Sequence, residues 1–179
     1  MRLCVYGAAS NDIHQDYLWA AEMLGITLAK KGIGLVFGAG DTGVMGACAR
    51  GCAAMGGEIV GVAPRFFDEP GILFQGCTEM HFTDTMRQRK ELMEQLSDGF
   101  IMAPGGIGTF EEFFEILTLR QLGRHQKPIA ILNVRGYYDP LLALLENAVA
   151  EHFLGGDVLK MFTVFRDPGK LPHVLEKLR

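Results

Sequence analysis

The chain has 179 residues, a formal net charge of −4 and 49% hydrophobic residues. This length and composition are typical of a single globular domain. A mildly acidic chain without a long run of Lys or Arg has no general attraction for nucleic acid or an anionic membrane. No apolar stretch approaches the roughly 20 residues that cross a bilayer. We therefore expect neither nucleic acid nor a membrane as partner, and a cytoplasmic location.

Short, continuous apolar runs alternate with stretches of helical periodicity along the chain. In chain order, the runs predict strands at 3–6, 35–37, 59–62, 100–102, 129–132 and 162–165, and the periodic stretches predict helices at 17–31, 45–55, 86–96, 109–122, 140–153 and 171–178. Continuous apolar strands are typical of a parallel sheet covered on both faces. The prediction is a Rossmann-like, doubly wound α/β fold in one domain, 1–179, with its site in the loops after the first, second, third and fourth predicted strands.

The first glycine loop, Gly38–Gly46, follows the second predicted strand and contains a G-x-G-x-x-G spacing. This spacing indicates close approach of a phosphate or sugar, and it makes Gly40 a candidate contact. A dinucleotide site also needs an acidic residue at the end of the next strand, but Glu58 lies at the start of that strand. NAD is therefore not expected. The alternative is that these glycines only serve tight turns and close packing.

The second glycine loop, Pro104-Gly105-Gly106-Ile107-Gly108-Thr109, lies between the fourth predicted strand and the helix predicted at 109–122. Its glycines let the backbone approach an anion, which the free N–H groups and the positive end of the helix attract. The hydroxyl of Thr109 adds a donor. Because no Lys follows the last glycine, the loop predicts a bound monophosphate rather than triphosphate hydrolysis.

Glu112 has two possible roles. It shares a helical stripe with Ile116 and Leu119, which turns it inward beside the glycine loop and favours a catalytic carboxylate. The alternative is a capping box from Thr109 to Glu112, in which Glu112 only returns to the Thr109 amide.

Arg89 lies on the apolar stripe of the helix predicted at 86–96, over Leu92, Met93 and Leu96. Its guanidinium must therefore find an anion on the buried side. That anion is either a ligand or an internal Asp or Glu in a structural pair.

Cysteines and histidines give no sign of a metal site. The four cysteines lack C-x-x-C pairing, and the five histidines are scattered. Ser10 lacks a G-x-S-x-G context, so a turn, a cap or a ligand hydrogen bond is expected of it. We expect no metal and no cofactor.

The segments Met86-Arg87-Gln88-Arg89-Lys90 and Pro104–Glu112 together resemble the Lonely Guy (LOG) family of cytokinin riboside 5'-monophosphate phosphoribohydrolases, and the likeness covers nearly the whole chain. The resemblance implies hydrolysis of the N-glycosidic bond of a purine nucleoside 5'-monophosphate. Arg89 and Glu112 match the catalytic residues of the family. We expect Glu112 to stabilise the sugar or orient water and Arg89 to stabilise the leaving purine; the reverse division stays open.

The resemblance also implies substrate contacts and a homodimer. The expected contacts are Gly105, Gly106, Gly108, Thr109, Lys90, Met86, Thr118, Gly40 and Glu69. Two departures, Arg87 where the family often has His and Leu119 where Trp is common, leave the choice between adenine and an N6-substituted adenine open. Family members often carry the label lysine decarboxylase, which we reject because no pyridoxal-phosphate site is recognisable. The helix predicted at 109–122 is apolar on nearly every side, so we expect one face to meet a second subunit.

Two rival interpretations remain. A nucleotide or molybdenum-cofactor carrier would use the same glycine loop without hydrolysis, although an inward carboxylate would weaken anion binding by repulsion. A purely structural α/β domain would leave both glycine loops and the inward arginine unexplained.

Overall fold

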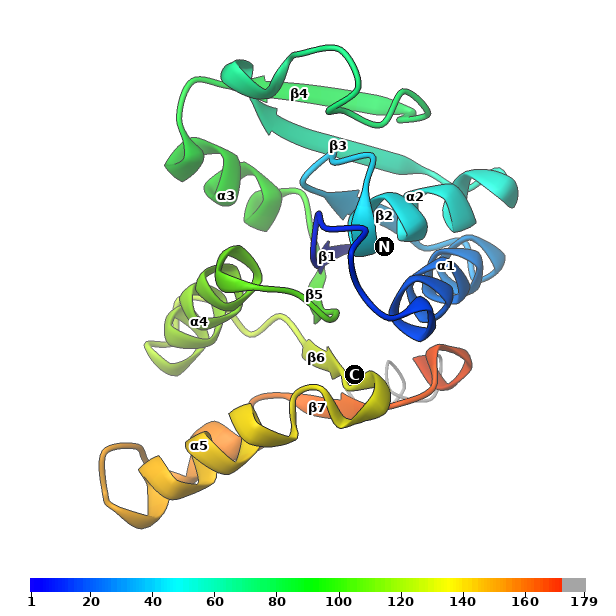
Figure 1. Ribbon diagram of the computed structural model, residues 1–179. Coiled ribbons are helices and arrows are strands. Elements are labelled where there is room, and N and C mark those ends of the chain that lie inside the picture. Colours follow the sequence, from blue (N-terminus) through cyan, green and yellow to red (C-terminus); the bar gives the residue numbers. More distant parts are fainter. Residues whose placement is uncertain (172–179) are drawn as a thin grey trace.

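The computed structural model describes residues 1–171, which form a seven-stranded sheet in the order β4-β3-β2-β1-β5-β6-β7 (Figure 1). Every neighbouring pair is parallel. The strands are β1 (Arg2–Tyr6), β2 (Gly34–Phe37), β3 (Ile59–Pro64), β4 (Glu79–Thr83), β5 (Gly99–Met102), β6 (Ile129–Leu132) and β7 (Thr163–Phe165). The predicted Rossmann-like α/β fold is confirmed.

Helices cover both faces of the sheet (Figure 1). On one face pack α1 (Gln15–Lys30) and α2 (Gly43–Ala54), and on the other pack α3 (Met86–Gln95), α4 (Ile107–Gln121) and α5 (Asp139–Ala150). The 3₁₀ turns are η1 (Arg65–Phe67), η2 (Val134–Gly136), η3 (Gly156–Lys160) and η4 (Pro168–Lys170). Because helices bury each face, the strand residues on both sides must be apolar.

Strand β1 illustrates this double burial. Leu3 and Val5 belong to the apolar cluster under α1 and α2, whereas Cys4 and Tyr6 belong to the cluster under α3, α4 and α5. All four residues are buried. The continuous apolar pattern therefore reports burial on both faces rather than a helix.

Strand β4 was not predicted, because it is a half-buried edge strand that carries Glu79 and His81 in place of an apolar run. Helix α4 begins at Ile107, two residues before the predicted start at Thr109. The helix predicted at 171–178 lies outside the described residues except for Leu171.

Strands β1 and β5 are neighbours in the sheet, and the chain leaves them toward opposite faces. Ala8 N donates to Pro104 O at 3.0 Å and joins the two loops just beyond the strand ends. In open α/β sheets, ligands bind at such a switch of direction. Within residues 1–171, no helix has the length and apolar character needed to cross a membrane.

Candidate active site

Arg89 is the buried cation of the site. Helix α3 begins with a capping box in which the Thr85 hydroxyl accepts from Gln88 N at 3.2 Å, and this start sets the direction of the helix. The Arg89 side chain is only 6% exposed. Its Nε donates to Val62 O at 3.1 Å and its Nη1 donates to Glu112 Oε1 at 2.9 Å. The predicted inward direction of Arg89 is confirmed.

Glu112 is the anion that Arg89 meets. Because α4 begins at Ile107 with Gly106 as N-cap, Thr109 lies inside the helix and the capping-box alternative for Glu112 is wrong. The Glu112 side chain is 11% exposed and that of Glu111 is 54% exposed. Glu112 therefore faces inward, as its helical stripe with Ile116 and Leu119 predicted. Burial raises the pKa of the Glu112 carboxyl above its ordinary value, and the neighbouring Arg89 opposes that rise.

The ion pair alone fits both a structural pair and a catalytic one. What favours a site is the space beside it, because Arg89 and Glu112 both line a cavity of about 370 Å³, which we call the glycine-loop cavity. Its size falls in the usual range of small-molecule sites. Its lining comes from the loops after β1, β3 and β5 and from the starts of α2, α3 and α4: Gly7, Ala8, Ala9, Ser10, Met45, Phe67, Met86, Arg89, Gly106, Gly108, Thr109 and Glu112.

The second glycine loop is open where a ligand would approach. A Cβ built on Gly106 or Gly108 meets nothing within 4 Å, whereas one built on Gly105 lies 2.1 Å from Thr109 Oγ1. Gly105 therefore makes room for the threonine, and the other two glycines leave the backbone bare toward the cavity. No side chain in the described part of the chain caps α4, so its first N–H groups remain free for an anion.

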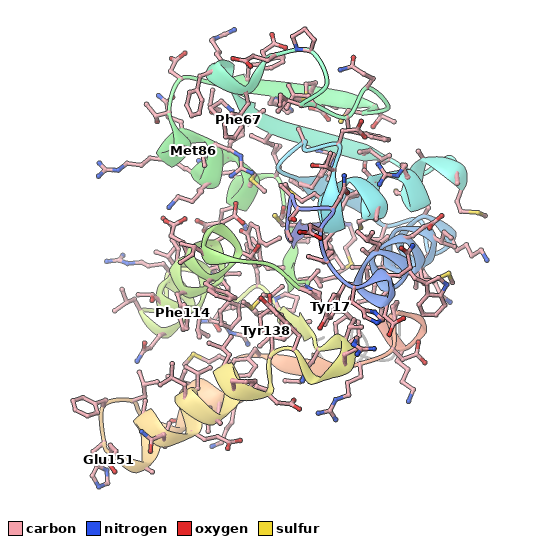
Figure 2. All side chains as sticks on the ribbon, viewed as in Figure 1. Tyr17, Phe67, Met86, Phe114, Tyr138 and Glu151 are labelled. Carbon is pink, nitrogen blue, oxygen red and sulfur yellow. The ribbon has the colours of Figure 1, made fainter. Side chains whose placement is uncertain are left out.

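The other predicted contacts fall into three groups. Met86 lines the glycine-loop cavity together with Phe67, and Figure 2 shows both side chains beside the start of α3. Gly40 lines an adjoining apolar cavity that also touches Arg89. Thr118 and Glu69 are exposed and contribute to neither cavity lining.

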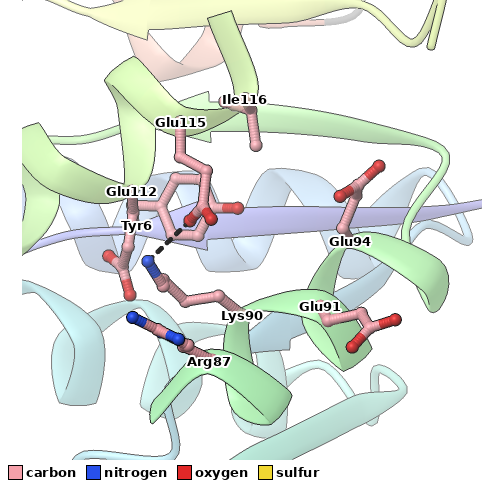
Figure 3. A pocket seen from close by; sticks show the side chains of 8 residues that line it. All are labelled: Tyr6, Arg87, Lys90, Glu91, Glu94, Glu112, Glu115 and Ile116. Atoms are coloured by element: carbon pink, nitrogen blue, oxygen red, sulfur yellow. Dashed lines mark ion pairs between the residues drawn. The ribbon is translucent and has the colours of Figure 1, made fainter. Parts of the chain in front are cut away.

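Lys90 lies on another side of the ion pair. It lines a smaller cavity of about 190 Å³, which we call the Lys90 cavity, together with Tyr6, Arg87, Glu91, Glu94, Glu112, Glu115 and Ile116 (Figure 3). Its ammonium forms ion pairs with Glu111 and, at 2.8 Å, with Glu115 Oε2. Glu112 thus borders both cavities.

Sequence reasoning missed several residues around the site. Ala8, Ala9, Met45 and Phe67 line the glycine-loop cavity, but small and apolar side chains carry no chemical signal. Tyr137 was also missed as a support, although its hydroxyl donates to Gly105 O at 2.7 Å and anchors the loop. The available signal was position, since Ala8 and Ala9 follow the first predicted strand and Met45 belongs to the first glycine loop.

Known proteins resemble this chain over most of its length. It is 45% identical to a cytokinin riboside 5'-monophosphate phosphoribohydrolase of Rhodococcoides fascians, over 75% of this chain and 68% of the relative. It is 35% identical to one of Arabidopsis thaliana, over 98% of this chain and 83% of the relative. The chain belongs to the Lonely Guy family. It is 37% identical to the cytokinin riboside 5'-monophosphate phosphoribohydrolase LOG of Oryza sativa subsp. japonica, over 89% of this chain and 66% of the relative.

One family model and two solved structures also match this LOG-family chain. A family model described as "Possible lysine decarboxylase" matches residues 45–175. The molybdenum cofactor carrier protein of Chlamydomonas reinhardtii superposes with a TM-score of 0.74 at 20% identity, covering 99% of this chain and 96% of the carrier. The molybdenum cofactor binding protein of Rippkaea orientalis superposes with a TM-score of 0.72, also at 20% identity, over 99% and 94%. These two structures share the fold.

Proposed function

We propose that this protein hydrolyses the N-glycosidic bond of purine nucleoside 5'-monophosphates. In this reaction the bond from ribose C1' to the purine nitrogen breaks, and a water oxygen bonds to C1'. One proton of that water ends on the departing purine, so the products are the free base and ribose 5-phosphate. The observation that carries the proposal is the Arg89–Glu112 pair, 2.9 Å between Nη1 and Oε1, beside an uncapped glycine loop.

The phosphate binds at the start of α4 in this proposal. Gly106 and Gly108 leave the backbone bare there, and the free N–H groups and helix dipole attract a dianion. Thr109 is only 4% exposed, and Gly105 leaves room for its hydroxyl, which is a further donor to the phosphate. The residue after the last glycine of the loop is Thr109 rather than Lys, which matches a monophosphate rather than a triphosphate.

The ribose lies next to the ion pair. Breaking the glycosidic bond builds positive charge on the sugar and negative charge on the purine, so a carboxylate and a guanidinium can stabilise the two ends. We assign Glu112 to the sugar and its attacking water and Arg89 to the leaving purine. The buried surroundings strengthen both interactions because little water screens them.

The purine lies along the apolar part of the glycine-loop cavity, against Met45, Phe67 and Met86. An adjoining cavity of about 240 Å³ continues from Met45 and Phe67 to Ile72 and Leu73. This apolar extension suits an alkyl substituent on N6 of adenine, as in cytokinin-type nucleotides, and its affinity gain would come from buried apolar area.

We also propose a homodimer and a cytoplasmic location. Phe114 on α4 is 36% exposed, Leu122 at the C-terminal end of this helix is 66% exposed, and Leu144 on α5, on the same face of the sheet, is 60% exposed. A second copy would bury such an apolar surface. Cys4, Cys48, Cys52 and Cys77 are all free thiols, which suits a reducing compartment.

Product analysis with matched nucleotides tests the proposal. The protein is incubated with AMP, isopentenyladenosine 5'-monophosphate and adenosine, and released base and ribose 5-phosphate are quantified by chromatography. We expect base from both monophosphates, faster from the isopentenyl compound, and at least about a hundredfold less from adenosine, since the phosphate contacts contribute about 2.7 kcal/mol or more. Tight binding of nucleotide without release of base would instead support a carrier.

A further inference from the structure

Lys90 follows Arg89 on α3, but its ammonium lies in the Lys90 cavity rather than in the glycine-loop cavity (Figure 3). The Lys90 side chain is 15% exposed. Its two partners, Glu111 and Glu115, both lie on α4, one just before Glu112 and the other almost one turn after it. The ammonium is thus bound by two carboxylates that flank the candidate catalytic residue Glu112 in the sequence of α4.

We propose that Lys90 is a positioning residue, whose ion pairs with Glu111 and Glu115 hold α3 against α4 and thereby fix Arg89 against Glu112. The proposal rests on the proposed function of that pair. It differs from the substrate contact that the family resemblance implies for Lys90, and the two roles predict different kinetics.

The packing of the two helices gives Lys90 this role. Helix α3 packs on β3 and β4, whereas α4 packs on β1, so each helix takes its position from different strands. The ion pairs of Arg89 and Lys90 connect the helices directly. A shift of about 1 Å between reacting groups can lower a rate about a hundredfold, so this connection matters for the geometry of Arg89 and Glu112.

Charge supports the same role. Three carboxylates of α4 meet two cations of α3: Arg89 pairs with Glu112, and Lys90 pairs with Glu111 and Glu115. Burial raises the pKa of the Glu112 carboxyl, and Arg89 lowers it. Among the weaker effects, Glu111 raises this pKa and Lys90 lowers it. Removing Lys90 would therefore leave Glu112 beside an uncompensated Glu111.

Kinetics of Lys90 variants on AMP separate positioning from substrate contact. For Lys90→Met we expect kcat to fall at least about tenfold while KM stays within about twofold, because the lost interaction acts on the transition state. Lys90→Arg should restore most of kcat, and Lys160→Met, which removes an exposed lysine, should behave as wild type. A rise in KM with unchanged kcat would overturn the proposal.

A double-mutant cycle shows whether Lys90 acts through its partners. If it does, Lys90→Met should cost less in the Glu111→Gln/Glu115→Gln background than in the wild type, because the ion pairs are already gone. Equal costs in both backgrounds would contradict a positioning role. Thermal unfolding of each variant separates these effects from loss of fold.

A titration without turnover separates this proposal from the proposed function. The carboxyl carbon of Glu112 is followed by ¹³C NMR and assigned with Glu112→Gln. The charged and titratable groups around it are those of α3, α4 and β1: Arg87, Arg89, Lys90, Glu91, Glu94, Glu111, Glu115, Cys4 and Tyr6. We expect Lys90→Met to move the Glu112 midpoint to higher pH, and an unchanged midpoint would overturn the proposal. If wild-type protein releases no base, the proposed hydrolysis fails while this titration still decides whether Lys90 controls Glu112.

Discussion

Gly38 and Arg89 lie so close that a side chain at position 38 would collide with the guanidinium of Arg89. A Cβ built on Gly38 would lie 1.9 Å from Nη2 of Arg89. Gly38 directly follows β2, so the first residue of the first glycine loop makes room for the guanidinium. The sequence left open that the glycines of this loop serve close packing, and Gly38 does so. Gly38 packs against Arg89, a residue of the candidate active site.

Gly38→Ala should displace the guanidinium of Arg89 from Glu112. We expect kcat/KM for base release to fall at least about tenfold, and overpacking to cost about 1–3 kcal/mol of unfolding free energy. The matched control is Gly155→Ala, at an extended position where an added Cβ meets nothing within 4 Å. Wild-type kinetics in Gly38→Ala would contradict the assignment of Arg89.

Gly108→Ala should separate binding from stability. Position 108 is helical and its added Cβ meets open space, so the melting temperature should stay the same or rise, since Ala is favoured over Gly in helices by about 0.5–1 kcal/mol. The methyl group would obstruct the phosphate, and we expect calorimetry to show at least about tenfold weaker AMP binding. Unchanged affinity would place the phosphate elsewhere. Gly105→Ala, which clashes with Thr109, should lower both stability and affinity.

The pH dependence of turnover should report Glu112. Its pKa is raised above the ordinary 4.5 by burial, and the ionised form is the one proposed to act. Activity should therefore rise with pH through a midpoint above 4.5 and be lost as pH falls through it. The check is a kcat/KM profile, with circular dichroism at each pH to exclude unfolding. A limb at or below 4.5 would show that another group controls the reaction.

Association through α4 should depend on its exposed apolar residues. Figure 2 shows Phe114 on this helix, and Leu122 follows its last residue. We expect the wild type to sediment as a dimer and the doubly substituted Phe114→Glu/Leu122→Glu chain to sediment as a monomer. Trp19→Glu is the control, because Trp19 is 58% exposed on α1, which covers the other face of the sheet. Sedimentation velocity decides the point; loss of the dimer with Trp19→Glu instead would move the interface to α1.

The fold could be predicted from the sequence wherever burial was complete. Strands such as β2 and β6 are buried at every position, so their apolar runs were visible. Strand β4 was not predicted because an edge strand needs no continuous apolar run. Its Glu79 instead forms an ion pair with Arg2 and a hydrogen bond with His81. The start of α4 was misplaced because Thr109 and Glu112 imitate a capping box.

The site could be predicted only in part. Helical spacing turned Arg89 and Glu112 inward, but nothing local showed that side chains 23 positions apart would meet at 2.9 Å. The two ion pairs of Lys90 could not be predicted either, because they depend on how α3 and α4 pack over the sheet. The hydrogen bond from Tyr137 to Gly105 likewise needs the strand order, because it joins loops beyond neighbouring strands β6 and β5.

The most direct test of the hydrolase assignment compares wild type with Arg89→Ala and Glu112→Gln on AMP, with both products quantified and thermal unfolding measured in parallel. We predict equal amounts of adenine and ribose 5-phosphate from wild type, and at least about a thousandfold less from each folded variant, a loss of about 4 kcal/mol of transition-state stabilisation. Folded variants that release base at the wild-type rate would contradict the account, as would a wild-type protein that binds AMP and releases nothing.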